Sequence, residues 1–117
     1  MLTATCHCGA VRIELPRRPR TLTSCNCSIC CRYGTLWAYY PVTEVRVVAR
    51  RGTTQSYAWG EKRLRFVRCR TCGCVTHWQG GRGHPRMGVN ARNLGADAIE
   101  SIRVRRLDGA RTWKLLD

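Results

Sequence analysis

The chain has 117 residues, 44% of them hydrophobic, with four Trp and four Tyr. This size and composition predict one folded domain over residues 1–117 and exclude a disordered chain. Twenty-one Lys and Arg against seven Asp and Glu give a formal net charge of +14, which would attract small anions, and nucleic acid without sequence preference. No apolar run approaches the roughly 20 residues that span a bilayer, and the first residues lack an export signal. We therefore expect a cytoplasmic protein that does not enter membranes.

Alternation of apolar and polar residues predicts half-buried strands in several short runs. In chain order these runs lie at 11–15, 36–40, 45–47, 64–66 and 102–104. Helix is expected only in short turns after Cys27 and around 96–100. The stretch 80–85 is either an ordinary connection or a binding loop, and Asp108-Gly109 predicts a hairpin between 102–107 and 111–115. The pattern as a whole indicates an all-β fold with little helix.

Nine cysteines dominate the chemistry of the chain. In a reducing compartment clustered cysteines are metal ligands more often than disulfides, and an odd number leaves one thiol unpaired in any intramolecular scheme. Two closely spaced pairs, Cys6 with Cys8 and Cys69 with Cys72, can close a tetrahedral Zn²⁺ shell. They predict a structural zinc site that joins the first strand to the middle of the chain. The alternative is four cysteines that are merely buried or free.

A second cluster, Cys25, Cys27 and Cys30, offers three thiolates within six residues. Three protein ligands and an open fourth position are typical of catalytic zinc. The alternative is a second closed structural site, completed by Cys31, Cys74 or a histidine. Thiol chemistry suits this ligand set better than hydrolysis does, and the sequence has no His-Glu-x-x-His or Gly-x-Ser-x-Gly motif. With seven thiolates and two Zn²⁺ ions the net charge would fall to about +11.

Four separated motifs make the chain resemble the family of glutathione-dependent formaldehyde-activating enzymes and centromere protein V. They are Cys6-His7-Cys8-Gly9-Ala10-Val11-Arg12, Ser24-Cys25-Asn26-Cys27-Ser28-Ile29-Cys30, the run from Phe66 to Gly73, and Val89-Asn90-Ala91-Arg92. The resemblance implies a tent-like fold of small sheets around zinc.

The resemblance also implies two Zn²⁺ ions: a structural one on Cys6, Cys8, Cys69 and Cys72, and a catalytic one on Cys25, Cys27 and Cys30. The implied activity is that of a carbon–sulfur lyase, which interconverts formaldehyde plus glutathione with S-(hydroxymethyl)glutathione. The implied partner is a small thiol such as glutathione. Cys31 stands where many relatives have a basic residue.

Arginines near these motifs are candidates for binding the carboxylates of glutathione, because guanidinium groups bind carboxylates in a bidentate way. They are Arg32, Arg86 and Arg92, and Asn90 is a candidate for orienting the substrate. The alternative for each arginine is a solvated surface side chain, and for Asn90 a strand end. His77 and His84 could carry protons near the open zinc.

Several aromatic residues can line a pocket or fill the core: Trp37, Tyr39, Tyr40, Trp59 and Trp78. The charge leaves a second function open, a non-catalytic basic zinc module that contacts nucleic acid or acidic partners. Catalytic silence with two structural zincs is a third. The sequence sets no oligomeric state.

Overall fold

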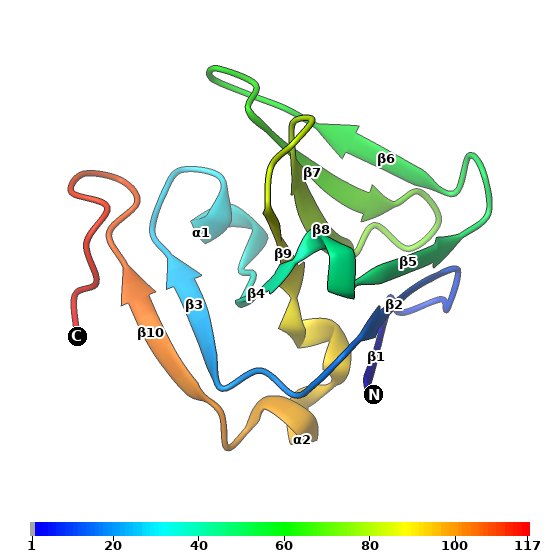
Figure 1. Ribbon diagram of the computed structural model, residues 1–117, viewed down its shortest axis with the longest axis horizontal. Coiled ribbons are helices and arrows are strands. Elements are labelled where there is room, and N and C mark those ends of the chain that lie inside the picture. The colour runs from blue at the N-terminus through cyan, green and yellow to red at the C-terminus, as the bar shows by residue number, and fades with distance from the viewer. Residues whose placement is uncertain (1) are drawn as a thin grey trace.

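The computed structural model describes residues 2–117, which form a mainly β fold with 43% strand and 13% helix (Figure 1). This confirms the predicted fold class. The elements, in chain order, are β1 (Leu2–Thr5), β2 (Val11–Leu15), β3 (Thr21–Cys25), α1 (Cys30–Tyr33), β4 (Trp37–Pro41), η1 (Val42–Glu44), β5 (Arg46–Ala49), β6 (Thr54–Tyr57), β7 (Leu64–Cys69), β8 (Val75–Gly80), β9 (Arg86–Asn90), η2 (Ala91–Leu94), α2 (Ala96–Ile99) and β10 (Arg103–Leu107).

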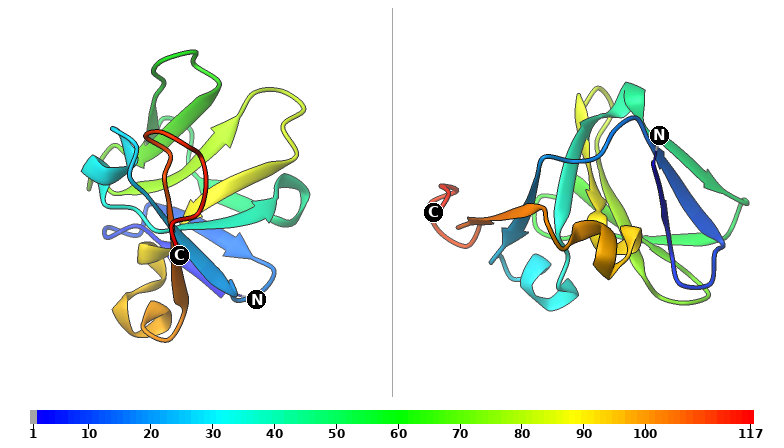
Figure 2. Two further views of the ribbon diagram at one scale, coloured as in Figure 1. Left: turned by 90° about the vertical axis from the view of Figure 1, so that its left-hand side faces the viewer. Right: turned by 90° about the horizontal axis from the view of Figure 1, so that it is seen from below.

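The strands form two sheets. One has the order β1-β2-β5 and the other β10-β3-β4-β9-β8-β7-β6. Strand β10 pairs parallel with β3, whereas the other strand pairs are antiparallel. The small sheet lies at one side of the molecule and β10 with β3 at the other, in Figure 1 and in the right-hand view of Figure 2.

The main core lies where the small sheet packs against the large one. In β2 the side chains of Val11, Ile13 and Leu15 are buried and Arg12 between them is exposed, so the predicted alternation is confirmed. The buried residues of the main core are Ala4, Ile13, Leu15, Leu22, Leu36, Ala38, Tyr40, Met87, Val89, Ala91 and Ile102. A second buried cluster groups Cys25, Cys30, Trp37, Phe66 and Trp78, so aromatic side chains pack beside the second group of cysteines.

Helix is confined to single turns. Both predicted turns are present as α1 and α2, and the acidic Asp97 lies in the first turn of α2. In residues 2–117 we find no helix with the length and apolar character needed to cross a membrane.

The hairpin predicted at Asp108-Gly109 is present only in part. The chain turns back after β10, and Leu107 forms one isolated antiparallel bridge with Leu115, flanked by hydrogen bonds from the amide of Asp108 to the carbonyl of Lys114 and from the amide of Leu116 to the carbonyl of Arg106. A full second strand does not form: β10 pairs along its length with β3, and the connection coils into turns in which the amide of Trp113 donates to the carbonyl of Asp108 at 2.8 Å. The Asp108 carboxylate also accepts side-chain hydrogen bonds from Asn26 and Thr112, and these contacts favour the coiled turn over a second ladder strand.

Candidate metal centres and the pocket beside them

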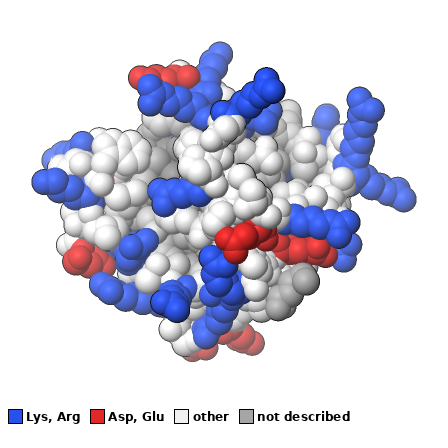
Figure 3. All heavy atoms as spheres, in the orientation of Figure 1, with Lys and Arg blue, Asp and Glu red and all other residues white. Residues whose placement is uncertain are grey.

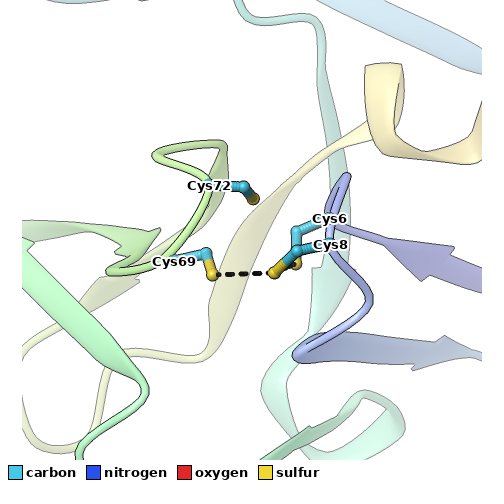
Figure 4. Close-up of side chains that lie close together, drawn as sticks. All are labelled: Cys6, Cys8, Cys69 and Cys72. Atoms are coloured by element: carbon cyan, nitrogen blue, oxygen red, sulfur yellow. Dashed lines mark hydrogen bonds between the residues drawn. The ribbon is translucent and has the colours of Figure 1, made fainter.

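The first cysteine cluster brings together two turns that are far apart in the sequence. Cys6 and Cys8 follow β1, while Cys69 ends β7 and Cys72 lies in the turn to β8; their side chains point toward one another (Figure 4). All four Sγ atoms lie within 4.8 Å of one another. Two of the separations are 3.8 Å, from Cys6 to Cys8, and 3.6 Å, from Cys8 to Cys69. A tetrahedral Zn²⁺ with bonds of about 2.3 Å would place sulfurs about 3.8 Å apart, so these four thiols fit a zinc ion.

Local backbone geometry explains why the turns can present two sulfurs each. Gly9 and Gly73 have φ values of +84° and +78°, which side-chain-bearing residues rarely adopt. The amide of Val11 donates to Cys6 Sγ at 3.3 Å, which fixes the position of this sulfur. Because β1 and β2 belong to the small sheet and β7 and β8 to the large one, an ion here would tie the two sheets together.

The second cluster lies between β3 and α1. The Sγ atoms of Cys25, Cys27 and Cys30 lie within 4.8 Å of one another, and these three thiols are the whole ligand group at this place among residues 2–117. Two further donors aim at the sulfurs. The indole Nε1 of Trp37 donates to Cys30 Sγ at 3.3 Å, and the amide of Cys30 donates to Cys27 Sγ at 3.4 Å. The arrangement suits a thiolate-bound soft metal ion with one free coordination position.

Neighbouring thiols change one another's acidity in this cluster. A hydrogen bond from Cys30 lowers the pKa of Cys25 to about 6, against the opposing effect of burial. The same contact, together with burial, raises the pKa of Cys30. The Cys25 thiol therefore gives up its proton to an incoming metal ion more readily than an ordinary thiol does.

The two remaining cysteines lie outside both clusters. Cys31 is exposed and its thiol faces the carbonyl of Ser28 at 3.6 Å. Cys74 packs beside the first cluster, and its carbonyl accepts from the amide of Cys69 at 3.0 Å. All nine cysteines are free of disulfides.

A cavity of about 780 Å³ opens beside Cys25, Cys27 and Cys30. Its walls come from segments far apart in the sequence and are mostly aromatic or aliphatic. The lining residues are Cys25, Cys27, Ser28, Ile29, Cys30, Trp37, Tyr39, Trp59, Gly60, Glu61, Arg63, Leu64, Phe66, Trp78, His84, Arg86, Leu107, Gly109, Ala110 and Trp113. A large concave apolar site with a few polar groups is the usual form of a small-molecule binding site.

Comparison with known proteins places this arrangement in a family. The family model described as glutathione-dependent formaldehyde-activating enzyme matches residues 1–103. The chain belongs to this family. It also resembles the crystal structure of a Rhodobacter sphaeroides protein, with 31% sequence identity, a TM-score of 0.73, and coverage of 88% of this chain and 99% of that one. Membership in this family of enzymes supports a glutathione-related, formaldehyde-activating function.

Among the residues predicted to contact substrate, the structure places Arg86 in the wall of the cavity. Its guanidinium lies 4.6 Å from the ring centroid of Tyr39, a cation–π contact. The other two arginines direct their side chains to backbone carbonyls, Arg32 to Ser28 and Arg92 to Gly34.

The buried Asn90 is engaged with the backbone. Its side-chain oxygen accepts from the amides of Leu36 and Arg92, and its side-chain nitrogen donates to the carbonyl of Val75. These bonds hold the end of β9 against the neighbouring turns, as the strand-end alternative described.

The two candidate histidines lie in different places. His84, in the loop 81–85, lines the cavity, and its ring meets that of Trp78 edge-on at 5.6 Å. The loop 80–85 therefore contributes to the pocket. His77 is 1% exposed and lines a different, smaller hollow with Arg50 and Arg65. Burial lowers the pKa of His77 to about 4, so it stays neutral near pH 7 and is a poor proton carrier.

The aromatic residues divide between pocket and core. Trp37, Tyr39, Trp59 and Trp78 line the cavity, whereas Tyr40 belongs to the main core and donates to the carbonyl of Arg17 at 2.9 Å.

Sequence reasoning missed several contributors to the cavity, including Arg63, Gly109 and Trp113. Arg63 lies three residues before the run that begins at Phe66, and Gly109 and Trp113 lie beyond the residues matched by the family model. The sequence held one signal for the C-terminal part of the wall. Asn26 lies between two candidate ligands, and an asparagine side chain at such a place often forms hydrogen bonds to the backbone of a neighbouring segment.

Proposed function

We propose that this protein is a zinc-dependent carbon–sulfur lyase that reversibly adds glutathione, or a related small thiol, to formaldehyde. The observation that carries the proposal is the group of three convergent thiols at the wall of an apolar cavity, in a chain of the formaldehyde-activating family. We further propose that residues 1–117 act as one zinc-binding domain with a structural and a catalytic Zn²⁺. Nine free cysteines support a reducing, cytoplasmic setting.

The reaction requires few bond changes. The thiol sulfur attacks the carbonyl carbon, a carbon–sulfur bond forms, the carbonyl π bond breaks, and the proton released by the thiol ends on the oxygen. A Zn²⁺ held by Cys25, Cys27 and Cys30 would supply charge stabilisation for the reacting sulfur or oxygen. The proposed role of the protein is to hold the two reactants next to each other and to exclude water.

Arg63 and Arg86 are the cationic side chains in the wall of the cavity. Glutathione carries two carboxylates, and guanidinium groups pair with carboxylates through two parallel hydrogen bonds. We assign the binding of these carboxylates to Arg63 and Arg86. Arg63 also pairs with Glu61 at 2.7 Å, but both side chains are largely exposed, so this ion pair is weak and can be exchanged for a ligand.

His84 is our candidate for the proton transfer. Its Nδ1 lies 2.8 Å from the carbonyl oxygen of Arg86. The amide of Arg86 approaches the same Nδ1 at 3.4 Å, but the carbonyl contact is the shorter one and a carbonyl can only accept; we therefore assign the proton of the neutral ring to Nδ1 and the lone pair to Nε2. Nε2 can therefore take the proton of an incoming thiol and return it to the oxygen of the product.

The test is the rate at which free formaldehyde disappears in the presence of glutathione, above the uncatalysed rate. We expect the wild-type protein to accelerate this loss and Cys27→Ser to abolish the acceleration. Cys31→Ser is the matched control, because Cys31 is exposed and lies outside both clusters. If wild type and Cys27→Ser give equal rates, formaldehyde is not the substrate.

A second candidate function, a basic module that binds nucleic acid, is favoured by the net charge of +14. Figure 3 shows the basic side chains scattered over the visible face with acidic ones among them, which suits a weak and unspecific contact. In that case affinity for arbitrary oligonucleotides would fall steeply between low and physiological salt and would be the same in Cys25→Ser.

A further inference from the structure

The C-terminal segment that follows β10 lies directly against the loop that carries Cys25 and Cys27. Asn26, between these two cysteines, connects the two. Its side-chain nitrogen donates to Asp108 Oδ1 at 3.0 Å, and its side-chain oxygen accepts from the amide of Ala110 at 3.0 Å. The amide of Asn26 donates to the carbonyl of Leu107 at 3.2 Å. The segment is therefore held in place by the same loop that presents the metal ligands.

The carboxylate of Asp108 organises the segment itself. Oδ2 accepts from the hydroxyl of Thr112 at 3.0 Å, and the Asp108 carbonyl accepts from the amide of Trp113 at 2.8 Å. Asp108 is only 9% exposed, so these hydrogen bonds are shielded from competing water. These hydrogen bonds give the turn from 108 to 113 a defined conformation, and they fix the backbone position of Trp113.

Gly109 lets this segment approach the reactive sulfurs. A Cβ atom at this position would lie 2.4 Å from Cys25 Sγ and 3.4 Å from Cζ3 of the Trp113 ring. The thiol and the indole therefore flank the same point of the backbone. Cys25 and Trp113 also line the same cavity, so the indole borders the space next to the sulfurs.

Two tryptophans at the rim of the cavity are unusually exposed. Trp113 is 69% exposed and Trp59 is 45% exposed, and both line the cavity beside the cysteines. They are more than fifty residues apart in the sequence, and both add apolar surface that the protein itself does not bury. The cavity of about 780 Å³ also has to hold the thiol of the proposed reaction. Glutathione is a polar tripeptide without an aromatic or branched apolar group, and formaldehyde adds only two heavy atoms, so the aromatic rim has no apolar counterpart in S-(hydroxymethyl)glutathione.

We propose that the segment 108–113 is a specificity wall, and that the site accepts thiol adducts of aldehydes with an apolar, preferably aromatic, substituent, which lies between Trp113 and Trp59. This rests on the proposed function, because the thiol part of the adduct is the part that Arg63, Arg86 and the metal site would hold. The chemistry is unchanged: the sulfur adds to the carbonyl carbon, and the thiol proton moves to the oxygen.

The test uses two stable thioethers as probes, S-methylglutathione and S-benzylglutathione, titrated by calorimetry into the metal-loaded protein. We expect S-benzylglutathione to bind about tenfold more tightly, because ring stacking and burial of a phenyl group are favourable. Trp113→Ala should remove this preference while the affinity for S-methylglutathione changes less than about twofold. Trp113→Phe should retain most of the preference, and Leu116→Ala, a change at another exposed apolar residue after β10, should retain all of it.

The proposal of a specificity wall would be refuted if wild type bound the two probes with equal affinity, or if Trp113→Ala weakened the binding of both probes equally. A failure of both probes to bind would also refute it, even if the protein accelerates formaldehyde addition, and that outcome would leave the proposed function standing. A tight, Trp113-dependent S-benzylglutathione complex in a protein that does not accelerate formaldehyde addition would retain the wall and remove formaldehyde as the substrate.

Discussion

Replacing Gly109 with alanine tests the link between the C-terminal segment and the second cysteine cluster. The new methyl group would lie 2.4 Å from Cys25 Sγ, about 1 Å closer than the 3.4 Å at which ordinary contact begins. Overpacking of this kind costs about 1–3 kcal/mol. The strain is relieved if the segment moves away or if the sulfur moves, and a sulfur that moves by this amount leaves its bond of about 2.3 Å to a zinc ion.

If about 1.4 kcal/mol of this strain falls on the metal-bound geometry, the dissociation constant of the second site rises about tenfold. The assay is competition for zinc with a coloured chelator, which separates the weaker site from the stronger one. Gly81→Ala is the matched control, since a Cβ there meets nothing within 4 Å. An unchanged affinity in Gly109→Ala would refute the proposed contact between this backbone and the metal site.

Two further predictions concern stability. Cys72→Ser removes one of four sulfurs from the site that joins the sheets, so we expect the free energy of unfolding to fall by about 3 kcal/mol or more and the melting temperature by about 10 °C. Cys31→Ser is the control and should melt like wild type. Equal melting temperatures of the two variants would contradict a structural metal. Burial lowers the pKa of His77 from 6.5 to about 4, so between these values the unfolded chain binds more protons, and up to about 3 kcal/mol of stability is lost as pH falls from 6.5 toward 4. His77→Gln should lack this part of the pH dependence in denaturant unfolding, and an equally steep fall in the variant would argue against a buried neutral histidine.

The sequence predicted those features that depend on local pattern. Strand β2 shows the buried and exposed alternation read from Val11 to Leu15, and the spacing of the cysteines anticipated both groups of convergent sulfurs. Tight turns force such pairs to point the same way, so spacing alone carries the geometry.

Features that depend on distant contacts were not predictable in this way. The adjacent residues Thr76 and His77 of β8 are both buried. The hydroxyl of Thr76 donates to the carbonyl of Val67 and also forms a hydrogen bond with Nδ1 of His77. A run with two adjacent buried polar residues shows no alternation. Nearness to a motif in the sequence did not separate the arginines, since Arg32 follows a ligand motif but donates to the carbonyl of Ser28, whereas Arg63, three residues before the run that begins at Phe66, lines the cavity.

The hairpin predicted after β10 is shortened to one bridge for a related reason. Asp-Gly favours a two-residue hairpin through its local backbone preference. Here the side chain of Asp108 is held by Asn26, more than eighty positions earlier in the chain. The specificity wall is a product of this contact and could be found only in three dimensions.

The most direct test of the central claim is the metal content of the purified protein. Two zinc ions per chain are predicted, one resistant to a mild chelator and one readily removed, with Cys27→Ser retaining only the resistant ion. A single ion in wild type, or a Cys27→Ser variant that still holds two, would contradict the assignment of Cys25, Cys27 and Cys30 as an open metal site.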